Sequence, residues 1–278
     1  MRIEHTLFSL PFAYLGAALS GGSTSVRDLV LIGLAVFGLR TAAMAYNNIA
    51  DLPIDAMNPR SKSRPLVTGA VSLRDAWALV VAGSLVYFAS AALLNKIALI
   101  LSPILWVVAI TYPWAKRIHW CPHLHLGLTL GLVVFGGAIA AVGDEANSVM
   151  EALSRVPWLI VASVTFWVAG FDIVYSIMDY EFDKSAGLGS VPARLGVKQA
   201  LLVALLCHAG AAATLYLAVE EYRLGIAGAA TAVAATLMLA YQHYLVLRRG
   251  LEAIPRAFNV NLAYGVLVGV GLTIAAIV

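Results

Sequence analysis

The stretch that decides the fold runs from Val26 to Ile49 and reads VRDLVLIGLAVFGLRTAAMAYNNI, followed directly by ADLPID. Most of it is apolar, and it is long enough to cross a bilayer core as a helix, which takes about 20 residues. Comparable stretches recur along all 278 residues. The sequence therefore predicts an all-α integral membrane protein, a bundle of about nine transmembrane helices in one domain over residues 1–278. The expected spans are His5–Gly21, Val26–Ile49, Leu73–Leu94, Ile97–Tyr112, Leu124–Val142, Pro157–Met178, Val197–Val219, Leu224–Leu247 and Phe258–Val278.

The composition agrees with a membrane protein. Hydrophobic residues make up 61% of the chain and charged residues 12%, whereas soluble domains carry about 25% charged residues. This excludes a soluble globular domain of the same length. The two cysteines, Cys121 and Cys207, form no disulfide framework. We expect the lipid bilayer as surroundings and no nucleic-acid partner.

Lysine and arginine are distributed unevenly between the connections. Twelve of them lie in or beside the connections after the second, fourth, sixth and eighth spans, and one lies in each of the other four. Because cytoplasmic connections carry an excess of Lys and Arg, we expect the basic connections and Arg2 in the cytoplasm. The C-terminus is then predicted to lie outside, in a multi-pass protein of the cell membrane.

A polar stripe closes the second span. Asn47, Asp51 and Asp55 are four residues apart, so on a helix each is offset by only about 40° from the previous one. Arg40 lies on nearly the same face, inside the apolar span, where a charge costs at least about 2.5–3.5 kcal/mol. We therefore expect Arg40 to face a polar cavity, and we expect Pro53 to distort or unwind the helix.

A second stripe closes the sixth span. Asp172, Asp179 and Asp183 fall within about 40° of one another on a helix, and Tyr175 lies close to the same face. In both places a proline and then a glycine four residues later follow the acids, at Pro65 and Gly69 and at Pro192 and Gly196. This faint repeat predicts that two aspartate-motif halves face each other across a site.

These residue types indicate a magnesium and diphosphate site. Mg²⁺ takes one or two carboxylates and shares the rest of its shell with phosphate oxygens and water. The basic residues Arg60, Lys62 and Arg64 follow the first stripe and suit anionic oxygens. Metal ions that stabilise a leaving diphosphate would promote ionisation of an allylic diphosphate to a carbocation, which a dry pocket protects from water.

The two stripes resemble the motifs of the UbiA superfamily of membrane prenyltransferases. The resemblance includes the residues that follow them, which are Arg64-Pro65-Leu66 after the first stripe and Gly187, Ser190 and Pro192 after the second. Tyr112-Pro113 and Lys116-Arg117 resemble a third conserved segment. The resemblance covers nearly the whole chain and is nearest to the 4-hydroxybenzoate polyprenyltransferase branch. It implies helices around a central cavity, an isoprenyl diphosphate donor, a small aromatic acceptor and Mg²⁺ as the cofactor.

The resemblance also implies roles for residues. The implied metal ligands are Asn47, Asp51, Asp55, Asp172, Asp179 and Asp183. The implied diphosphate ligands are Arg60, Arg64 and Lys116, with Lys184 a weaker candidate. Arg40 and Tyr175 would lie near the acceptor or the reaction centre, and the implied catalytic set is Arg40, Asp51, Asp55, Asp172, Tyr175 and Asp179.

Some features of the sequence admit other interpretations. The segment Asp179–Gly196 also resembles UbiA-like enzymes of the futalosine route to menaquinone, which leaves the acceptor open. A cation-coupled secondary transporter would place its acids near the bilayer midplane rather than at the ends of two spans. His119, Cys121, His123 and His125 fit no common zinc spacing. His208, His243, Asn259 and Asn261 are expected to hydrogen-bond between helices.

Overall fold

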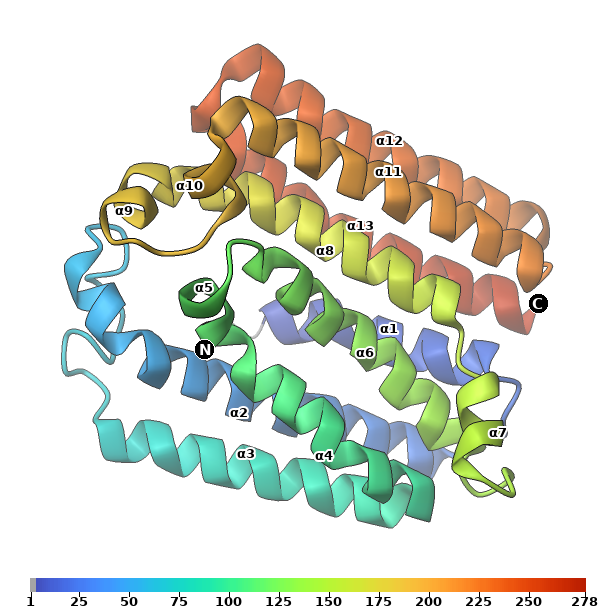
Figure 1. The fold of residues 1–278 in the computed structure, drawn as a ribbon. Helices are drawn as coiled ribbons and strands as arrows, with labels where there is room; N and C mark the ends of the chain where they lie inside the picture. Colours follow the sequence, from blue (N-terminus) through green and yellow to red (C-terminus); the bar gives the residue numbers. More distant parts are fainter. Residues whose placement is uncertain (1–3) are drawn as a thin grey trace.

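The computed structural model describes the backbone of residues 4–278 and the side chains from Ser9 onward; Arg2 lies outside the described residues. The described chain is helical and contains no strand, which confirms the all-α prediction (Figure 1). The longer helices are α1 (Glu4–Leu19), α2 (Val26–Met57), α3 (Leu73–Leu94), α4 (Lys96–Thr111), α6 (Pro122–Val142), α8 (Trp158–Ser176), α11 (Val197–Glu221), α12 (Gly225–Arg249) and α13 (Ile254–Ile277). The short ones are η1 (Tyr112–Trp114), α5 (Ala115–Ile118), α7 (Val149–Ser154), η2 (Ile177–Asp179), α9 (Tyr180–Ser185), α10 (Val191–Leu195) and η3 (Leu251–Ala253).

Eight helical segments of the described chain are long and apolar enough to cross a membrane. They correspond to the second to ninth expected spans. The first expected span corresponds to α1, which has 16 residues and contains Pro11. It is shorter than the roughly 20 residues of a full crossing, and it packs against α6 and α13 inside the bundle.

The starts of α2 and α3 are set by local sequence. Ser25 caps α2 and Ser72 caps α3, in each case by accepting a hydrogen bond from the backbone N–H three residues on. The carboxylates of Asp28 and Asp75 in turn accept the backbone N–H of Ser25 and Ser72. Such capping boxes satisfy N–H groups that the first turn of a helix leaves free.

Glycines allow the central helices to approach closely. A Cβ at Gly127 of α6 would lie 2.2 Å from the Thr165 carbonyl oxygen of α8, and one at Gly137 would lie 1.8 Å from that of Ala13 in α1. Gly38 and Gly83 join α2 to α3 in the same way. Because lipid provides no hydrophobic force between helices, close backbone packing of this kind holds membrane bundles together.

The helix that carries the first stripe does not unwind. α2 continues as one α-helix through Pro53 to Met57, so the expectation of an unwound segment there was wrong. Proline removes one N–H, and the rest of the turn continues to bond, with the Asn58 N–H donating to the Ile54 carbonyl at 3.0 Å. The break lies in the second stripe, where α8 ends at Ser176 and a 3₁₀ turn carries Asp179.

The two stripes end on the same side of the bundle. Figure 1 shows α5, α9 and α10 gathered at the end of the molecule where α2 terminates, with α7 and the C-terminus at the other end. The glycine that follows each stripe has a similar backbone conformation. Gly69 and Gly196, each four residues after a proline, both have a positive φ, of 77° and 84°. Glycine adopts this conformation without steric cost.

Candidate active site

Asp51 is the centre of the first aspartate cluster. It is 4% exposed, and the Lys116 ammonium from α5 contacts its Oδ2 at 2.7 Å. The Arg117 guanidinium lies 3.5 Å from Oδ1 and is stacked over the Trp114 ring at 4.5 Å. Asn47, one turn earlier on α2, donates to Oδ2 at 3.4 Å. The predicted stripe therefore forms, and two basic residues of α5 close over it.

Asp55 lies one turn further on and is 5% exposed. The Arg64 guanidinium, from the connection between α2 and α3, donates to its carboxylate. We call Asn47, Asp51, Asp55, Arg64, Lys116 and Arg117 the first half-site.

The second cluster combines residues from four elements. Asp179 accepts hydrogen bonds from Arg60 at 2.5 Å and from Asn58 at 3.1 Å. The carboxylate of Asp183 bonds the Ser190 side chain. Asp172, inside α8, contacts Nδ1 of His123 at 2.6 Å. We call Asp172, Asp179 and Asp183, with their partners Asn58, Arg60, His123 and Ser190, the second half-site.

The two half-sites are in contact. Asn58 and Arg60 follow α2 yet bind Asp179 of the second half-site. The Gly189 N–H, just before α10, donates to the Lys116 carbonyl at 2.6 Å. The halves predicted to face each other from their repeat are therefore joined by hydrogen bonds.

Arg40 and Tyr175 lie beside these clusters. The Arg40 guanidinium donates to the Ser9 hydroxyl at 3.3 Å, and its Nε is buried with no hydrogen-bond partner among the described residues. Tyr175 lies under the Arg60 guanidinium at 4.8 Å and against the Phe258 ring at 4.7 Å. Arg40 thus faces a cavity, but the cavity is lined mainly by apolar side chains and is not the polar one that the sequence predicted.

Lys184 was predicted as a weaker candidate for diphosphate binding, but its contacts are with Tyr180. Its side chain is on the exposed face of α9, where the ammonium bonds the Tyr180 hydroxyl at 3.4 Å and lies 5.5 Å from that ring. No contact of Lys184 with either half-site is present among the described residues.

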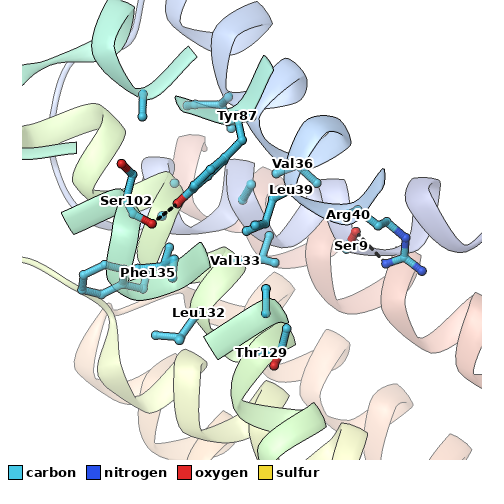
Figure 2. A pocket seen from close by; sticks show the side chains of 18 of the residues that line it. Ser9, Val36, Leu39, Arg40, Tyr87, Ser102, Thr129, Leu132, Val133 and Phe135 are labelled. Atoms are coloured by element: carbon cyan, nitrogen blue, oxygen red, sulfur yellow. Dashed lines mark hydrogen bonds between the residues drawn. The ribbon is translucent and has the colours of Figure 1, made fainter. Parts of the chain in front are cut away.

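Figure 2 shows an apolar cavity with Arg40 in its wall. It lies between α1, α2, α3, α4 and α6, and its volume is about 170 Å³. Arg40, Met44 and Tyr112 line one end, close to Asn47, and Ile32 and Leu94 line the other. Ile32 and Met44 are twelve residues apart on α2, so the cavity spans about 18 Å of helix. A long hydrocarbon chain would fit this shape.

Four residues that contact the aspartates are absent from the predicted set of site residues: Asn58, Arg117, His123 and Ser190. Asn58 and Arg117 lie in or beside a motif, but their partners are 121 and 66 positions away, so no local pattern identifies the contact. The sequence offered His123 only as a member of a poor zinc pattern. In the structure His123 bonds Asp172, and His125 bonds the Val108 carbonyl at 3.0 Å.

No three His, Cys, Asp or Glu side chains of the described chain form a preformed metal cage, and basic residues contact several of the carboxylates. The donor set nevertheless suits a hard cation. Oδ1 of Asp51 is buried without a hydrogen-bond partner among the described residues, and carboxylate and amide oxygens are the ligands that Mg²⁺ prefers. The residues present therefore fit Mg²⁺ held together with an anionic substrate.

The chain is similar in sequence and fold to several known proteins. A 4-hydroxybenzoate octaprenyltransferase of Alkalilimnicola ehrlichii is 31% identical over 259 residues, covering 90% of this chain and 83% of the relative. One from Sodalis glossinidius is 32% identical over 254 residues, covering 90% and 83%. The solved apo structure of a UbiA homologue from Aeropyrum pernix is 55% identical, with a TM-score of 0.95 and coverage of 99% and 98%.

A UbiA homologue from Archaeoglobus fulgidus, solved with DMAPP and Mg²⁺, has the same fold at 20% identity, with a TM-score of 0.66 and coverage of 97% of both chains. The model of the UbiA prenyltransferase family matches residues 9–265. That range includes both half-sites and the apolar cavity. The match confirms the resemblance carried by the aspartate motifs, and the chain belongs to the UbiA prenyltransferase family.

Proposed function

We propose that the protein transfers an isoprenyl group from an allylic isoprenyl diphosphate to an aromatic acceptor, 4-hydroxybenzoate, with the help of Mg²⁺. The observation that carries the proposal is the position of the two half-sites at one end of the apolar cavity. A diphosphate needs cations and a hydrocarbon tail needs an apolar enclosure, and the two environments adjoin between Met44 and Asn47 on α2.

Mg²⁺ bound by Asn47, Asp51, Asp55, Asp172, Asp179 and Asp183 would stabilise charge on the leaving diphosphate. Arg60, Arg64 and Lys116 would bind the diphosphate oxygens, and Lys184 would join them only by leaving Tyr180. Each of the first three contacts an aspartate, so each is already within reach of the metal and its anion.

In the proposed reaction the bond between the allylic carbon and the diphosphate oxygen breaks first. The carbocation then bonds to a ring carbon of the acceptor, which loses a proton. Arg40 is suited to the acceptor end, because its partly unsatisfied guanidinium lies in the cavity wall. Tyr175 would lie near the reaction centre through Arg60, whose guanidinium lies over its ring at 4.8 Å, while the Phe258 ring packs against it at 4.7 Å.

The relatives support the choice of substrates. Two of them carry the name 4-hydroxybenzoate octaprenyltransferase, and Archaeoglobus homologues have been solved with DMAPP or GPP and Mg²⁺. The test is to incubate purified protein with Mg²⁺, geranyl diphosphate and a panel of aromatic acceptors, and to identify products by mass. A prenylated 4-hydroxybenzoate that is absent in EDTA supports the proposal. Prenylation of another acceptor alone would replace 4-hydroxybenzoate, and no product with any acceptor would refute prenyl transfer.

We further propose that the aspartate end faces the cytoplasm and the C-terminus lies outside. The support is the excess of Lys and Arg in the connections at that end. Reporter fusions test this directly, since a periplasm-active reporter at the C-terminus and a cytoplasm-active one in the α2–α3 connection should both function in the bacterial host. The opposite pattern would reverse the orientation.

A further inference from the structure

His123 is a buried histidine within contact distance of a candidate catalytic carboxylate. It is 2% exposed and stands at the second position of α6, after Pro122. Its Nδ1 lies 2.6 Å from Oδ2 of Asp172 on α8, and its Nε2 accepts the backbone N–H of Val191 at 3.2 Å. One imidazole therefore joins α6, α8 and α10.

The second contact determines the tautomer. A backbone N–H can only donate, so Nε2 must present a lone pair to Val191 and carries no proton. The ring proton is then on Nδ1, where it donates to the Asp172 carboxylate. Both ring nitrogens are used, and the imidazole is neutral.

The donor that fixes the tautomer is itself held rigidly. Val191 is fully buried and follows Ser190, which caps α10 by accepting the Ala193 N–H at 3.2 Å. The same connection bonds the Lys116 carbonyl through the Gly189 N–H. The segment whose Val191 N–H fixes the tautomer of His123 therefore also contacts Lys116 of the first half-site.

Asp172 needs such support more than the other aspartates do. It lies deepest along α8, within electrostatic reach of Tyr112 in the cavity wall, and its contact among the ion pairs of the described chain is with His123 alone. The imidazole holds Oδ2 and leaves Oδ1 for the bound cation or the reacting substrate.

We propose that His123 is a positioning residue. As a neutral Nδ1–H imidazole it orients Asp172 toward the site, and the Val191 N–H keeps it in that form. The inference rests on the proposed function, because it gives Asp172 a part in binding Mg²⁺ and diphosphate. Supporting residues of this kind affect metal affinity or activity by about 10–100-fold.

Two isosteric substitutions separate this role from simple packing. Asparagine places its amide nitrogen near the position of Nδ1, so His123→Asn keeps the donor to Asp172 and leaves the Val191 N–H unpaired. Glutamine places its amide near Nε2, so His123→Gln keeps the acceptor for Val191 and loses the donor to Asp172. His125→Asn, on the same helix, is the matched control.

The experiment measures Tm, kcat and the affinity for Mg²⁺ with inorganic diphosphate by calorimetry. His123→Asn should lower Tm more than His123→Gln does, yet keep kcat and the affinity within about threefold of the parent protein, while His123→Gln loses about 10–100-fold. His125→Asn should leave kcat and the affinity unchanged. A packing role predicts that activity follows Tm. Equal losses in both His123 variants, or a larger loss in His123→Asn, would overturn the proposal.

The calorimetry also separates the inference from the proposed function. If the parent protein binds Mg²⁺ and diphosphate but forms no product with any acceptor, prenyl transfer fails while the order of affinities still decides the role of His123. If the parent protein binds neither Mg²⁺ nor diphosphate, both proposals fail. An Asp172→Asn background adds a second criterion, since His123→Gln should weaken binding no further there.

Discussion

The two half-sites carry similar motifs but balance their charges differently. In the first, two buried carboxylates face three cations, Arg64, Lys116 and Arg117. In the second, three carboxylates have one ion pair with an arginine among the described residues, that of Asp179 with Arg60, and their other hydrogen-bond partners are Asn58, His123 and Ser190. Lys116 of the first half-site lies within electrostatic reach of Asp183. The described chain thus balances the carboxylates of the first half-site more fully than those of the second, which has the greater need of an added cation.

The two half-sites also differ in the backbone that carries their aspartates. The first stripe lies on an unbroken helix, and the second is divided between α8, a 3₁₀ turn and α9. A continuous helix holds its carboxylates at fixed spacing, while a broken one can direct them individually toward a bound ion. The comparison indicates that the first half-site mainly positions the diphosphate and that the second has the greater demand for Mg²⁺.

The largest effect is expected when either half-site loses its central carboxylate. Asp51→Ala and Asp179→Ala should each lower kcat/KM for prenyl transfer on the order of 10³-fold, because neither half-site alone can stabilise the leaving diphosphate. Glu181→Ala, which alters an exposed acid on α9, is the control. Full activity in either aspartate variant, in protein that remains folded in detergent, would contradict the two-sided mechanism.

The charge imbalance predicts unequal responses to Mg²⁺. Asp183→Asn should raise the Mg²⁺ concentration for half-maximal activity by about 10–100-fold. Asp55→Asn should raise it less, because Arg64 has already neutralised that carboxylate. Activity measured over a magnesium titration decides between them. An equal or larger shift in Asp55→Asn would remove the distinction between the half-sites.

The two lysines provide a finer comparison. Lys116 contacts Asp51 and lies within electrostatic reach of Asp183, so Lys116→Ala should raise the KM for geranyl diphosphate by about tenfold, the loss of one charge-assisted contact of about 1.5 kcal/mol. Lys184→Ala should change it less than about twofold, because Lys184 contacts Tyr180 instead. Equal shifts would mean that Lys184 turns into the site when substrate binds.

The smallest effect is expected at the opposite end of the bundle. Glu145, between α6 and α7, accepts the backbone N–H and the hydroxyl of Ser23 at 2.9 and 2.8 Å and pairs with Arg155 at 3.0 Å. The Ser23 N–H bond, with the others, lowers the pKa of Glu145 from 4.5 to about 2. Its stabilisation is thus complete above about pH 4.5 and is lost as the pH falls toward 2.

Glu145→Gln should consequently lower Tm by no more than about 2 °C at pH 7, and the difference from the parent protein should shrink as the pH falls below about 4.5. Prenyl transfer should be unchanged. Thermal unfolding at several pH values checks the first statement, and a drop in kcat would show that this end of the bundle communicates with the half-sites.

Much of the fold follows from the sequence because membrane spans depend on local composition. Asp51, Asp55, Asp172 and Asp179 were found from helical spacing, which is also local. The expected unwinding at Pro53 did not occur. A helix can continue through a proline when the neighbouring backbone hydrogen bonds remain, and the residue type alone does not tell whether they do. The segment of α1 was expected to cross the whole membrane, but in the structure it is a helix of only 16 residues inside the bundle.

The partners of the aspartates depend on distant contacts. Asn58 meets Asp179 across 121 positions, and His123 meets Asp172 across 49. No periodicity within one helix encodes such a pair. For the same reason the apolar cavity could be expected only as a consequence of the family resemblance, and its walls became known only when the helices were packed together.

The glycine contacts make some walls of the cavity stiffer than others. α6 is locked against α1 and α8 by Gly137 and Gly127, and α2 against α3 by Gly38 and Gly83, where no movement inward is available to the backbone. α4 lines the cavity between these two rigid pairs, and it contains Pro103. We therefore expect α4 to bend more easily than the other helices that line the cavity. Bending of this one helix would let the cavity accept hydrocarbon chains of different width while the reacting end of the chain stays in place.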